Sequence, residues 1–152
     1  FRPSPAWGGS CFPKDLIEVN NFYKEGEVML PLISNIIESN VIQTKWTVDK
    51  LTSILINENI KSVLLIGAAF KEDTDDLRNS PTLDIYKMLH QKDVNTFIYD
   101  EMVELGEYNT LDNLDEISEK TLVVLMYPVK KILMQRIESI ITDTNSILYT
   151  PW

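Results

Sequence analysis

Residues Ser62 to Phe70 read SVLLIGAAF, and this stretch decides the fold. Its continuous apolar run is typical of a strand that is buried on both faces, as in a parallel sheet. A polar loop at 71–79 follows, and Ser80 as an N-cap before Pro81 predicts a helix that reaches Gln91. Strand, loop and helix together indicate the first unit of an α/β fold.

Further strands and helices alternate along the rest of the chain. We expect strands at 95–100, 121–127 and 146–149, and helices at 111–119 and 130–141. This order predicts a Rossmann-like parallel sheet with helices on both faces and right-handed crossovers. Ligands of such sheets bind at the carboxyl ends of the strands, here in the loops after Phe70, Asp100 and Tyr127.

The chain before this domain is predicted to be helical after a short loop. The prolines and glycines of residues 1–12 prevent regular structure. We expect one helix to begin at Pro13 and to end near Gly26, and a long second helix over 30–56. That helix would measure about 40 Å, so part of its apolar face should contact another chain. A helix packed only on its own domain is the alternative.

The expected organisation is thus a helical segment, 1–58, followed by the Rossmann-like domain, 59–152. Of the 152 residues, 44% are hydrophobic, which suits a globular core. The first residue is Phe1 rather than Met, so we expect the chain to be cut from a longer polypeptide.

Charge and hydropathy exclude several classes of partner. The formal net charge of −9 argues against nucleic acid, whose binding needs clustered Lys and Arg. We find neither an apolar run of the roughly 20 residues that a membrane span requires nor a signal sequence. We therefore expect a cytoplasmic protein that binds neither membrane nor nucleic acid.

The single cysteine, Cys11, lies just before the first predicted helix. One cysteine excludes an intrachain disulfide and a cysteine-rich metal site, so we expect no metal. The unpaired amides at the start of a helix favour an anion such as a thiolate, and Lys14 adds a positive charge nearby. Asp15 can return to the same helix end, to polarise a water or to balance Lys14. A buried, unreactive cysteine is the alternative.

Two stretches of the sequence, taken in order, resemble a known family. Gly8 to Asp15 reads GGSCFPKD and resembles the active-site loop of the UDP-glucose/GDP-mannose dehydrogenase family. Gly67 to Pro81 reads GAAFKEDTDDLRNSP and resembles G-x-A-F-K-x-x-T-D-D-x-R-x-S-P, which opens the C-terminal sugar-nucleotide domain of that family. The resemblance covers nearly the whole chain, from the end of the central, dimer-forming helical domain through the C-terminal domain.

The resemblance implies an NAD-dependent oxidation of a UDP-sugar for polysaccharide precursor synthesis, in which the C6 alcohol becomes a carboxylate through an aldehyde. Cys11 would be the catalytic nucleophile that forms a thiohemiacetal and then a thioester, and Asp15 would assist with water. By the same resemblance, Lys14 and Arg78 approach NAD. The residues that would contact the substrate are Arg2, Trp7, Gly8, Phe70 and Lys71.

The resemblance also implies partners. The chain has no G-x-G-x-x-G fingerprint, so NAD binding would depend on an N-terminal domain of the full-length protein, and this chain alone should be inactive. A homodimer through the long helix is expected. Residues 4–7 read SPAW where the family commonly has G-x-G-F, and the C-terminal domain is short. UDP-glucose, UDP-N-acetylmannosamine, UDP-N-acetylglucosamine and GDP-mannose all stay open as substrates.

Other functions stay open as well. A noncatalytic nucleotide-binding or dimerisation module would keep the fold without the reaction. An acyl-transferring enzyme would need a base beside Cys11, and His90 is the only histidine. The loop at 71–79 can also be interpreted as a solvated turn with its aspartates exposed, Asp76 included. Asp100 imitates a ribose-binding acid, a weak signal without the glycine fingerprint.

Overall fold

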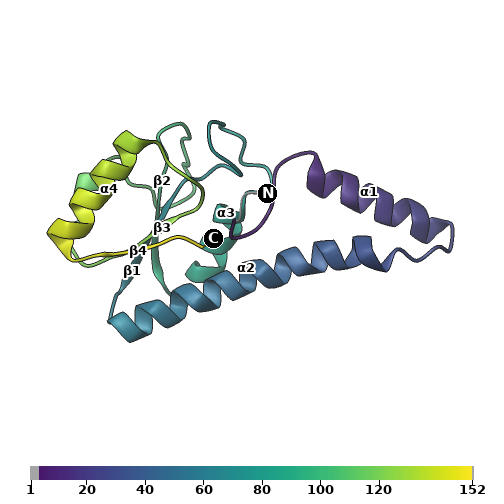
Figure 1. Cartoon of the computed structure of the whole chain (residues 1–152), viewed down its shortest axis with the longest axis horizontal. Helices are drawn as coiled ribbons and strands as arrows, with labels where there is room; N and C mark the ends of the chain where they lie inside the picture. The colour runs from purple at the N-terminus through teal and green to yellow at the C-terminus, as the bar shows by residue number, and fades with distance from the viewer. Residues whose placement is uncertain (1–3, 152) are drawn as a thin grey trace.

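The computed structural model describes residues 4–151 and shows an α/β domain with a helical hairpin attached to it (Figure 1). The helices are α1 (Phe12–Glu25), α2 (Pro31–Glu58), α3 (Pro81–His90) and α4 (Lys131–Thr144), with a short 3₁₀ helix, η1 (Leu114–Glu116). The strands are β1 (Ser62–Ile66), β2 (Asn95–Tyr99), β3 (Leu122–Leu125) and β4 (Ile147–Tyr149). The predicted fold class, a helical segment with one long helix followed by a Rossmann-like domain, is confirmed.

The sheet is parallel throughout, with the strand order β2-β1-β3-β4. Successive side chains of a strand point to opposite faces, so Val63 and Leu65 pack toward α2 and α3, while Leu64 and Ile66 pack toward α4. Helices thus cover both faces of β1. This two-sided burial explains the continuous apolar run that marks β1 in the sequence.

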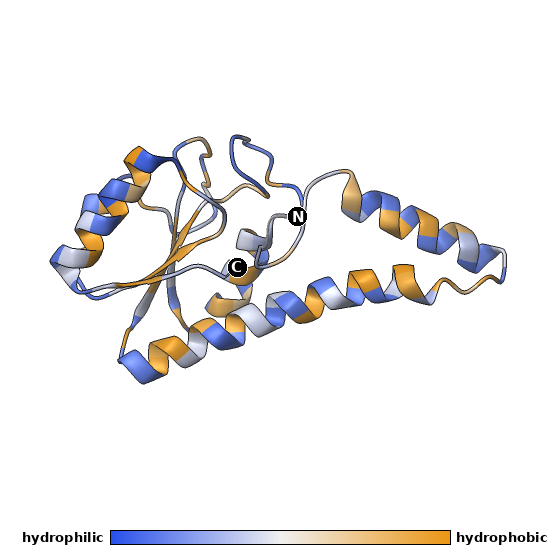
Figure 2. Ribbon diagram, viewed as in Figure 1, coloured by the Kyte–Doolittle hydropathy of each residue, from blue (hydrophilic) through white to orange (hydrophobic). Residues whose placement is uncertain are grey.

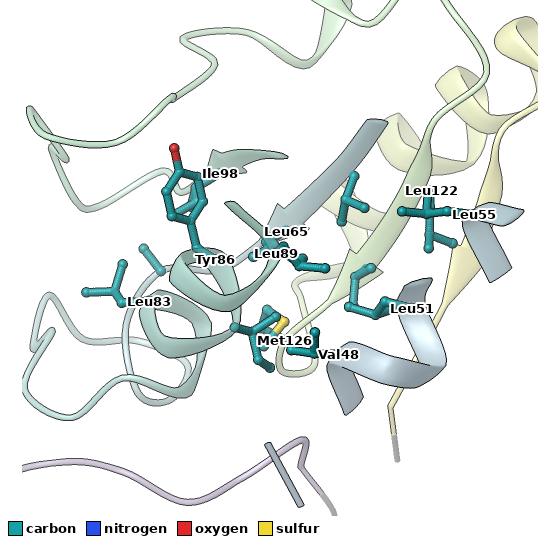
Figure 3. Close-up of a cluster of buried hydrophobic side chains, with 14 of the residues drawn as sticks. Val48, Leu51, Leu55, Leu65, Leu83, Tyr86, Leu89, Ile98, Leu122 and Met126 are labelled. Atoms are coloured by element: carbon teal, nitrogen blue, oxygen red, sulfur yellow. The ribbon is translucent and has the colours of Figure 1, made fainter. Parts of the chain in front are cut away.

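The larger hydrophobic core lies between the sheet and the helices α2 and α3 (Figure 3). Leu51 of α2, Leu65 of β1 and Leu89 of α3 are completely buried in it. On the other face, Leu133 and Ile137 of α4 form a smaller core against the sheet. Each buried side chain of this size contributes about 1.5–3 kcal/mol, so these contacts hold the second half of α2 to the domain.

The first half of α2 pairs with α1 in an antiparallel hairpin that extends away from the sheet (Figure 1). Ser34 Oγ of α2 donates a hydrogen bond of 2.8 Å to Asn20 Oδ1 of α1. Hydrophobic residues recur along both helices of the hairpin (orange in Figure 2). Large apolar side chains stay exposed there, including Phe22 at 71% and Leu32 at 74%. Within residues 4–151, no helix is long and apolar enough to cross a membrane.

The helix expected at 111–119 was a wrong prediction, because only η1 forms there. The Asn113 side chain accepts a hydrogen bond from the Asp115 N–H, and the Glu116 side chain accepts one from the Asn113 N–H. This capping box closes a single turn, and the backbone is extended again at Ile117. The capping box therefore begins a helical turn, but the residues after it do not extend this turn into a helix.

The strand expected at 62–70 is also shorter than predicted and ends at Ile66. Gly67 has a φ of 101°, which lies outside the β region and suits glycine. Its N–H donates to the Tyr99 carbonyl over 2.9 Å. Ser80 occupies the predicted N-cap position of α3, but its hydroxyl donates to the Ala68 carbonyl instead of capping the helix.

Candidate functional site

A cleft lies at the carboxyl end of the sheet, where ligands of parallel α/β folds bind. Its volume is about 250 Å³, and the N-terminal loop, the loop after β1 and the loop after β3 all contribute to its wall. Trp7, Phe70, Lys71 and Tyr127 line it. Lys71 Nζ lies 5.3 Å from the centre of the Phe70 ring, so an aromatic face and a cation are presented together.

The loop after β1, residues 67–80, is held by its own hydrogen bonds. The Phe70 N–H donates to the Asp76 carbonyl over 3.1 Å, and the Asp76 side chain receives Arg78 Nε at 2.9 Å and Nη2 at 2.7 Å. These bonds from Arg78 favour the carboxylate and lower the pKa of Asp76 from 3.8 to about 2. With its side chain 18% exposed and paired with Arg78, Asp76 is not the exposed aspartate of a solvated turn.

Asp100, which follows β2, joins the carboxyl ends of the first three strands. Its carboxylate accepts hydrogen bonds from the N–H of Ala68 at 2.7 Å, the hydroxyl of Tyr127 at 3.0 Å and the N–H of Met102 at 2.8 Å. Burial, and then the charge of Asp100, raise the pKa of Tyr127, so the phenol stays protonated and donates. Asp100 therefore fixes the loops around the cleft rather than presenting itself as a ribose-binding acid.

The two motifs that carry the family resemblance meet in space. The Gly9 N–H donates to the Arg78 carbonyl over 3.0 Å, and Asn79 Nδ2 donates to the Gly9 carbonyl over 2.9 Å. A Cβ on Gly8 would lie 1.9 Å from the Asn79 oxygen, and one on Gly9 would lie 2.9 Å from the Phe70 ring. Both glycines are therefore needed for the close approach of the two loops.

Cys11 is exposed at the N-cap position of α1. Its Sγ lies 3.6 Å from Ser10 Oγ. The side chain of Arg78 forms its hydrogen bonds with Asp76, and these raise the pKa of the guanidinium. Because the side chain is exposed, the alternative of a buried cysteine is wrong, and the reactivity of the thiol stays a prediction.

Lys14 and Asp15 occupy the first turn of α1 and are both exposed. Lys14 Nζ forms its ion pair with Glu18 Oε1 at 3.6 Å, one helical turn further on. The ion-pair partner of Lys14 is therefore Glu18 and not Asp15, and the role of Asp15 toward water stays a prediction.

The predicted site residues fall into two groups. The first group lines the cleft or lies at the loop junction beside it, and consists of Trp7, Gly8, Phe70, Lys71 and Arg78. The second group lies on the exposed start of α1, outside the lining of the cleft, and consists of Cys11, Lys14 and Asp15. Arg2 lies outside the residues that the structure describes.

Asn40 of α2 is a site residue that sequence reasoning missed. Its Oδ1 accepts a hydrogen bond from the Trp7 N–H at 2.9 Å, and its Nδ2 donates to the Trp7 carbonyl at 3.0 Å. The signal was present in the sequence: Asn40 follows Ile36 and Ile37 at helical spacing, so a polar side chain stands in an apolar stripe. A half-buried carboxamide in such a stripe requires a partner.

Two other kinds of chemistry find no support at this site. In the described part of the chain, no group of three or more His, Cys, Asp or Glu side chains is arranged to hold a metal ion. His90 stacks on Tyr86 at the end of α3, whereas Asn79, which contacts the cysteine loop, lies before the start of α3. The only histidine is thus remote from Cys11, which argues against an acyl-transferring cysteine enzyme.

Comparison with known proteins identifies the relatives of this chain. Residues 64–148 match the UDP binding domain of the UDP-glucose/GDP-mannose dehydrogenase family. UDP-glucose 6-dehydrogenase of Rickettsia felis is 34% identical over 116 residues, which are 76% of this chain and 25% of that protein. GDP-mannose 6-dehydrogenase of Pseudomonas savastanoi pv. phaseolicola is 31% identical over 148 residues, which are 97% of this chain and 32% of that protein. The chain therefore spans a quarter to a third of the length of these relatives.

Solved structures share the fold of the whole chain. UDP-D-ManNAc dehydrogenase from Pyrococcus horikoshii superposes with a TM-score of 0.81 at 24% identity, over 99% of this chain and 36% of that one. GDP-mannose dehydrogenase from Pseudomonas aeruginosa gives 0.77 at 24% identity, over 98% of this chain and 37% of that one. Because the family's UDP-binding-domain match alone covers more than half of the sequence, this chain belongs to the UDP-glucose/GDP-mannose dehydrogenase family.

Proposed function

We propose that this chain is the catalytic-cysteine and sugar-nucleotide-binding half of an NAD-dependent UDP-sugar 6-dehydrogenase. The observation that carries the proposal is the contact of the two motifs, in which Gly9 is hydrogen-bonded to Arg78 and Asn79. This contact sets the loop that leads to Cys11 against the loop that forms the cleft. A nucleophile and a ligand-binding cleft are thereby brought to one edge of the sheet.

The cleft supports a nucleotide sugar as its ligand. Trp7, Phe70 and Tyr127 offer aromatic surfaces on which a base or a sugar ring can pack. Lys71 offers a cation to a phosphate. The choice of uridine rests on the match of residues 64–148 to a UDP binding domain.

In the proposed reaction, the Cys11 thiolate adds to the C6 aldehyde and forms a C–S bond, which gives a thiohemiacetal. Loss of the C6 hydride to the bound oxidant and of the hydroxyl proton to solvent then leaves a thioester. Water attacks the thioester, the C–S bond breaks, and the sugar carboxylate leaves as the thiolate is restored. Asp15 would assist the attacking water. Covalent capture keeps the reactive aldehyde on the protein between the two oxidations. The product would serve as a polysaccharide precursor.

NAD would reach this site from outside the sheet of this chain. In place of a glycine-rich turn, the loop after β1 is a long charged segment, and the Thr82 hydroxyl at the start of α3 is bound to the Gly67 carbonyl at 2.8 Å. The exposed Arg78, whose carbonyl is bound by Gly9 of the cysteine loop, and the exposed Lys14 fit the border of a site that an N-terminal NAD-binding domain completes. When bound, NAD supplies the hydride acceptor for both oxidations.

The division into a dimer-forming helical segment at 1–58 and a UDP-sugar-binding domain at 59–152 is part of the same proposal. The exposed apolar side chains of the hairpin, such as Phe22 and Leu32, support a homodimer through the long helix. A cytoplasmic location would give this protein access to its nucleotide substrates.

Calorimetric titration of the chain with UDP, with ADP and GDP as controls, tests the proposal. We expect selective binding of UDP and a loss of affinity of about tenfold in Lys71→Ala, which removes a charge-assisted contact. Lys50→Ala is the matched control, because Lys50 is exposed on α2 and away from the cleft. We expect no NADH formation by this chain alone. Absence of UDP binding, both alone and with the N-terminal domain restored, would refute the proposal.

A noncatalytic module of the same family is the second candidate. The position of Cys11 outside the lining of the cleft favours it. Turnover by the protein with its N-terminal domain separates the two functions. Activity that Cys11→Ser abolishes supports the dehydrogenase, whereas UDP binding with no turnover in that longer protein supports the module.

A further inference from the structure

The loop from Ser4 to Cys11 has no regular structure and is fixed at separate points. α2 holds it at Trp7 through both hydrogen bonds of Asn40. The loop after β1 holds it at Gly9. Trp7 also packs edge-to-face on Phe12, with ring centres 4.8 Å apart. Cys11 therefore lies between Gly9, which the α/β domain holds, and Phe12, which packs on Trp7.

The Asn40 side chain suits this task because a carboxamide is both a donor and an acceptor. It pairs with the N–H and the carbonyl of one residue, as a neighbouring strand would. Aspartate would keep the acceptor for the Trp7 N–H but would lose the donor to the Trp7 carbonyl. Alanine would lose both.

Asn40 also lies where the hairpin meets the domain. A cavity of about 160 Å³ at this junction is lined by residues of the loop, α1, α2 and α3, including Trp7, Pro13, Asn40 and Asp84. One helical turn further, Thr44 donates to the Asn40 carbonyl at 3.0 Å. The hydroxyl of the completely buried Thr47 lies 3.0 Å from the Gln43 carbonyl of its own helix and 3.5 Å from the Pro5 carbonyl of the loop. This face of α2 is thus polar toward the loop, in contrast to its apolar face toward the sheet.

We propose that Asn40 is the positioning residue of the cysteine loop: by fixing the Trp7 backbone, it sets both the Trp7 wall of the cleft and the place of Cys11. The inference rests on the proposed function only in taking Cys11 as the nucleophile. Its structural part, the restraint of Trp7 by Asn40, is independent of any activity.

Amide hydrogen exchange of this chain tests the structural part. We expect the Trp7 amide to exchange about tenfold faster or more in Asn40→Ala, because its acceptor is gone. Asn40→Asp keeps that acceptor and should retain most of the protection. Asn35→Ala is the matched control, since Asn35 is exposed on the same helix. If Asn40→Ala does not fold, Asn40→Asp still tests the inference. This variant loses the hydrogen bond to the Trp7 carbonyl, so we expect the amides of Gly8 and Gly9, which follow in the loop, to exchange faster. Unchanged exchange in the folded variants would overturn the inference.

Kinetics of the protein with its N-terminal domain tests the functional part. With active sites counted by titration of the Cys11 thiol, we expect Asn40→Ala to lower kcat about tenfold to a hundredfold, because the nucleophile is misplaced. The KM for NAD should stay unchanged, and Asn40→Asp should be intermediate. A lower melting temperature with an unchanged kcat per thiol would show a purely structural role and overturn the inference. If the enzyme is active without Cys11, the proposed function fails, while the exchange result for Trp7 stands.

Discussion

The two halves of α2 have similar apolar side chains but meet different surroundings. In the second half, Val48, Leu51 and Leu55 are buried against the sheet and α3. In the first half, Leu32 is 74% exposed and Ile42 is 57% exposed. One helix thus continues from a closed core into a hairpin on which Leu32 and Ile42 are largely uncovered within the described chain. An apolar pattern predicts where a helix forms, but the surface that it meets decides how much each side chain contributes to stability.

The largest expected effect tests this contrast with one substitution made twice on the same helix. Leu51→Ala should lower the free energy of unfolding by about 2–5 kcal/mol, because it leaves a cavity in the core. At protein concentrations low enough to keep the chain monomeric, Leu32→Ala should change it by less than about 0.5 kcal/mol. Urea unfolding followed by circular dichroism measures both. Similar losses for the two variants would mean that Leu32 is covered in solution, and the contrast between the halves would fail.

The next effect concerns the junction between the two regions. Gly8→Ala should cost about 1–3 kcal/mol, since its Cβ would meet the Asn79 carbonyl and force the loops apart. Gly106→Ala serves as the control, because a Cβ there meets no atom within 4 Å. The same urea titration measures both variants. A neutral Gly8→Ala would show that the loop does not rest on the domain as closely as described.

A smaller effect compares one tyrosine in each region. Tyr127→Phe should cost about 1 kcal/mol, because it removes the hydroxyl that donates to Asp100 at 3.0 Å. Tyr23→Phe on α1 is the counterpart, and we expect no measurable change there, since Tyr23 is 40% exposed. Thermal unfolding of both variants at neutral pH gives the comparison. A larger loss for Tyr23→Phe than for Tyr127→Phe would reverse it.

The smallest effect compares one ion pair in each region through its pH dependence. The folded-state pKa of Asp76 lies below its ordinary value of 3.8, at about 2. Its contribution to stability is therefore present above about pH 4 and is lost as the pH falls toward 2. Asp76→Asn should flatten the acid limb of stability against pH. Glu18→Gln, which breaks the exposed Lys14 pair of the hairpin, should leave that limb as in the wild type. Parallel curves for wild type and Asp76→Asn would contradict this.

The sheet could be predicted from the sequence because its signals are local. The start of the strand predicted at 62–70 and the Ser80-Pro81 helix start each depend on a few neighbouring residues, and both lie where expected, although the strand ends early at Ile66. The wrong prediction of a helix at 111–119 also has a local cause. The apolar spacing suggested a helix, but the capping box of Asn113 and Glu116 closes a single 3₁₀ turn, after which the backbone is extended. Capping residues mark where a helix can begin and do not set its length.

The site was predicted less completely, because its bonds connect distant segments. The motif residues Phe70 and Lys71 could be identified, and both line the cleft. The roles of Asn40 and Asp100 could not be deduced, since their partners Trp7, Ala68 and Tyr127 lie more than 25 residues away in sequence. For Asn40, only the polar residue in an apolar stripe hinted at a contact, and nothing in the stripe pointed to Trp7 as its partner.

The wall of the cleft is built from both the N-terminal loop and the α/β domain. Binding of a ligand there is therefore coupled to the contact between these two regions. Trp7 belongs to the loop that α2 holds, while Phe70 belongs to the domain. A ligand that contacts both must leave before the loop can separate from the domain, so binding raises the free energy of that local opening. At a ligand concentration of one hundred times its dissociation constant, the rise amounts to about 2.7 kcal/mol. An occupied cleft would therefore protect the N-terminal loop from proteases, and the extent of that protection would report how much of the protein is in complex.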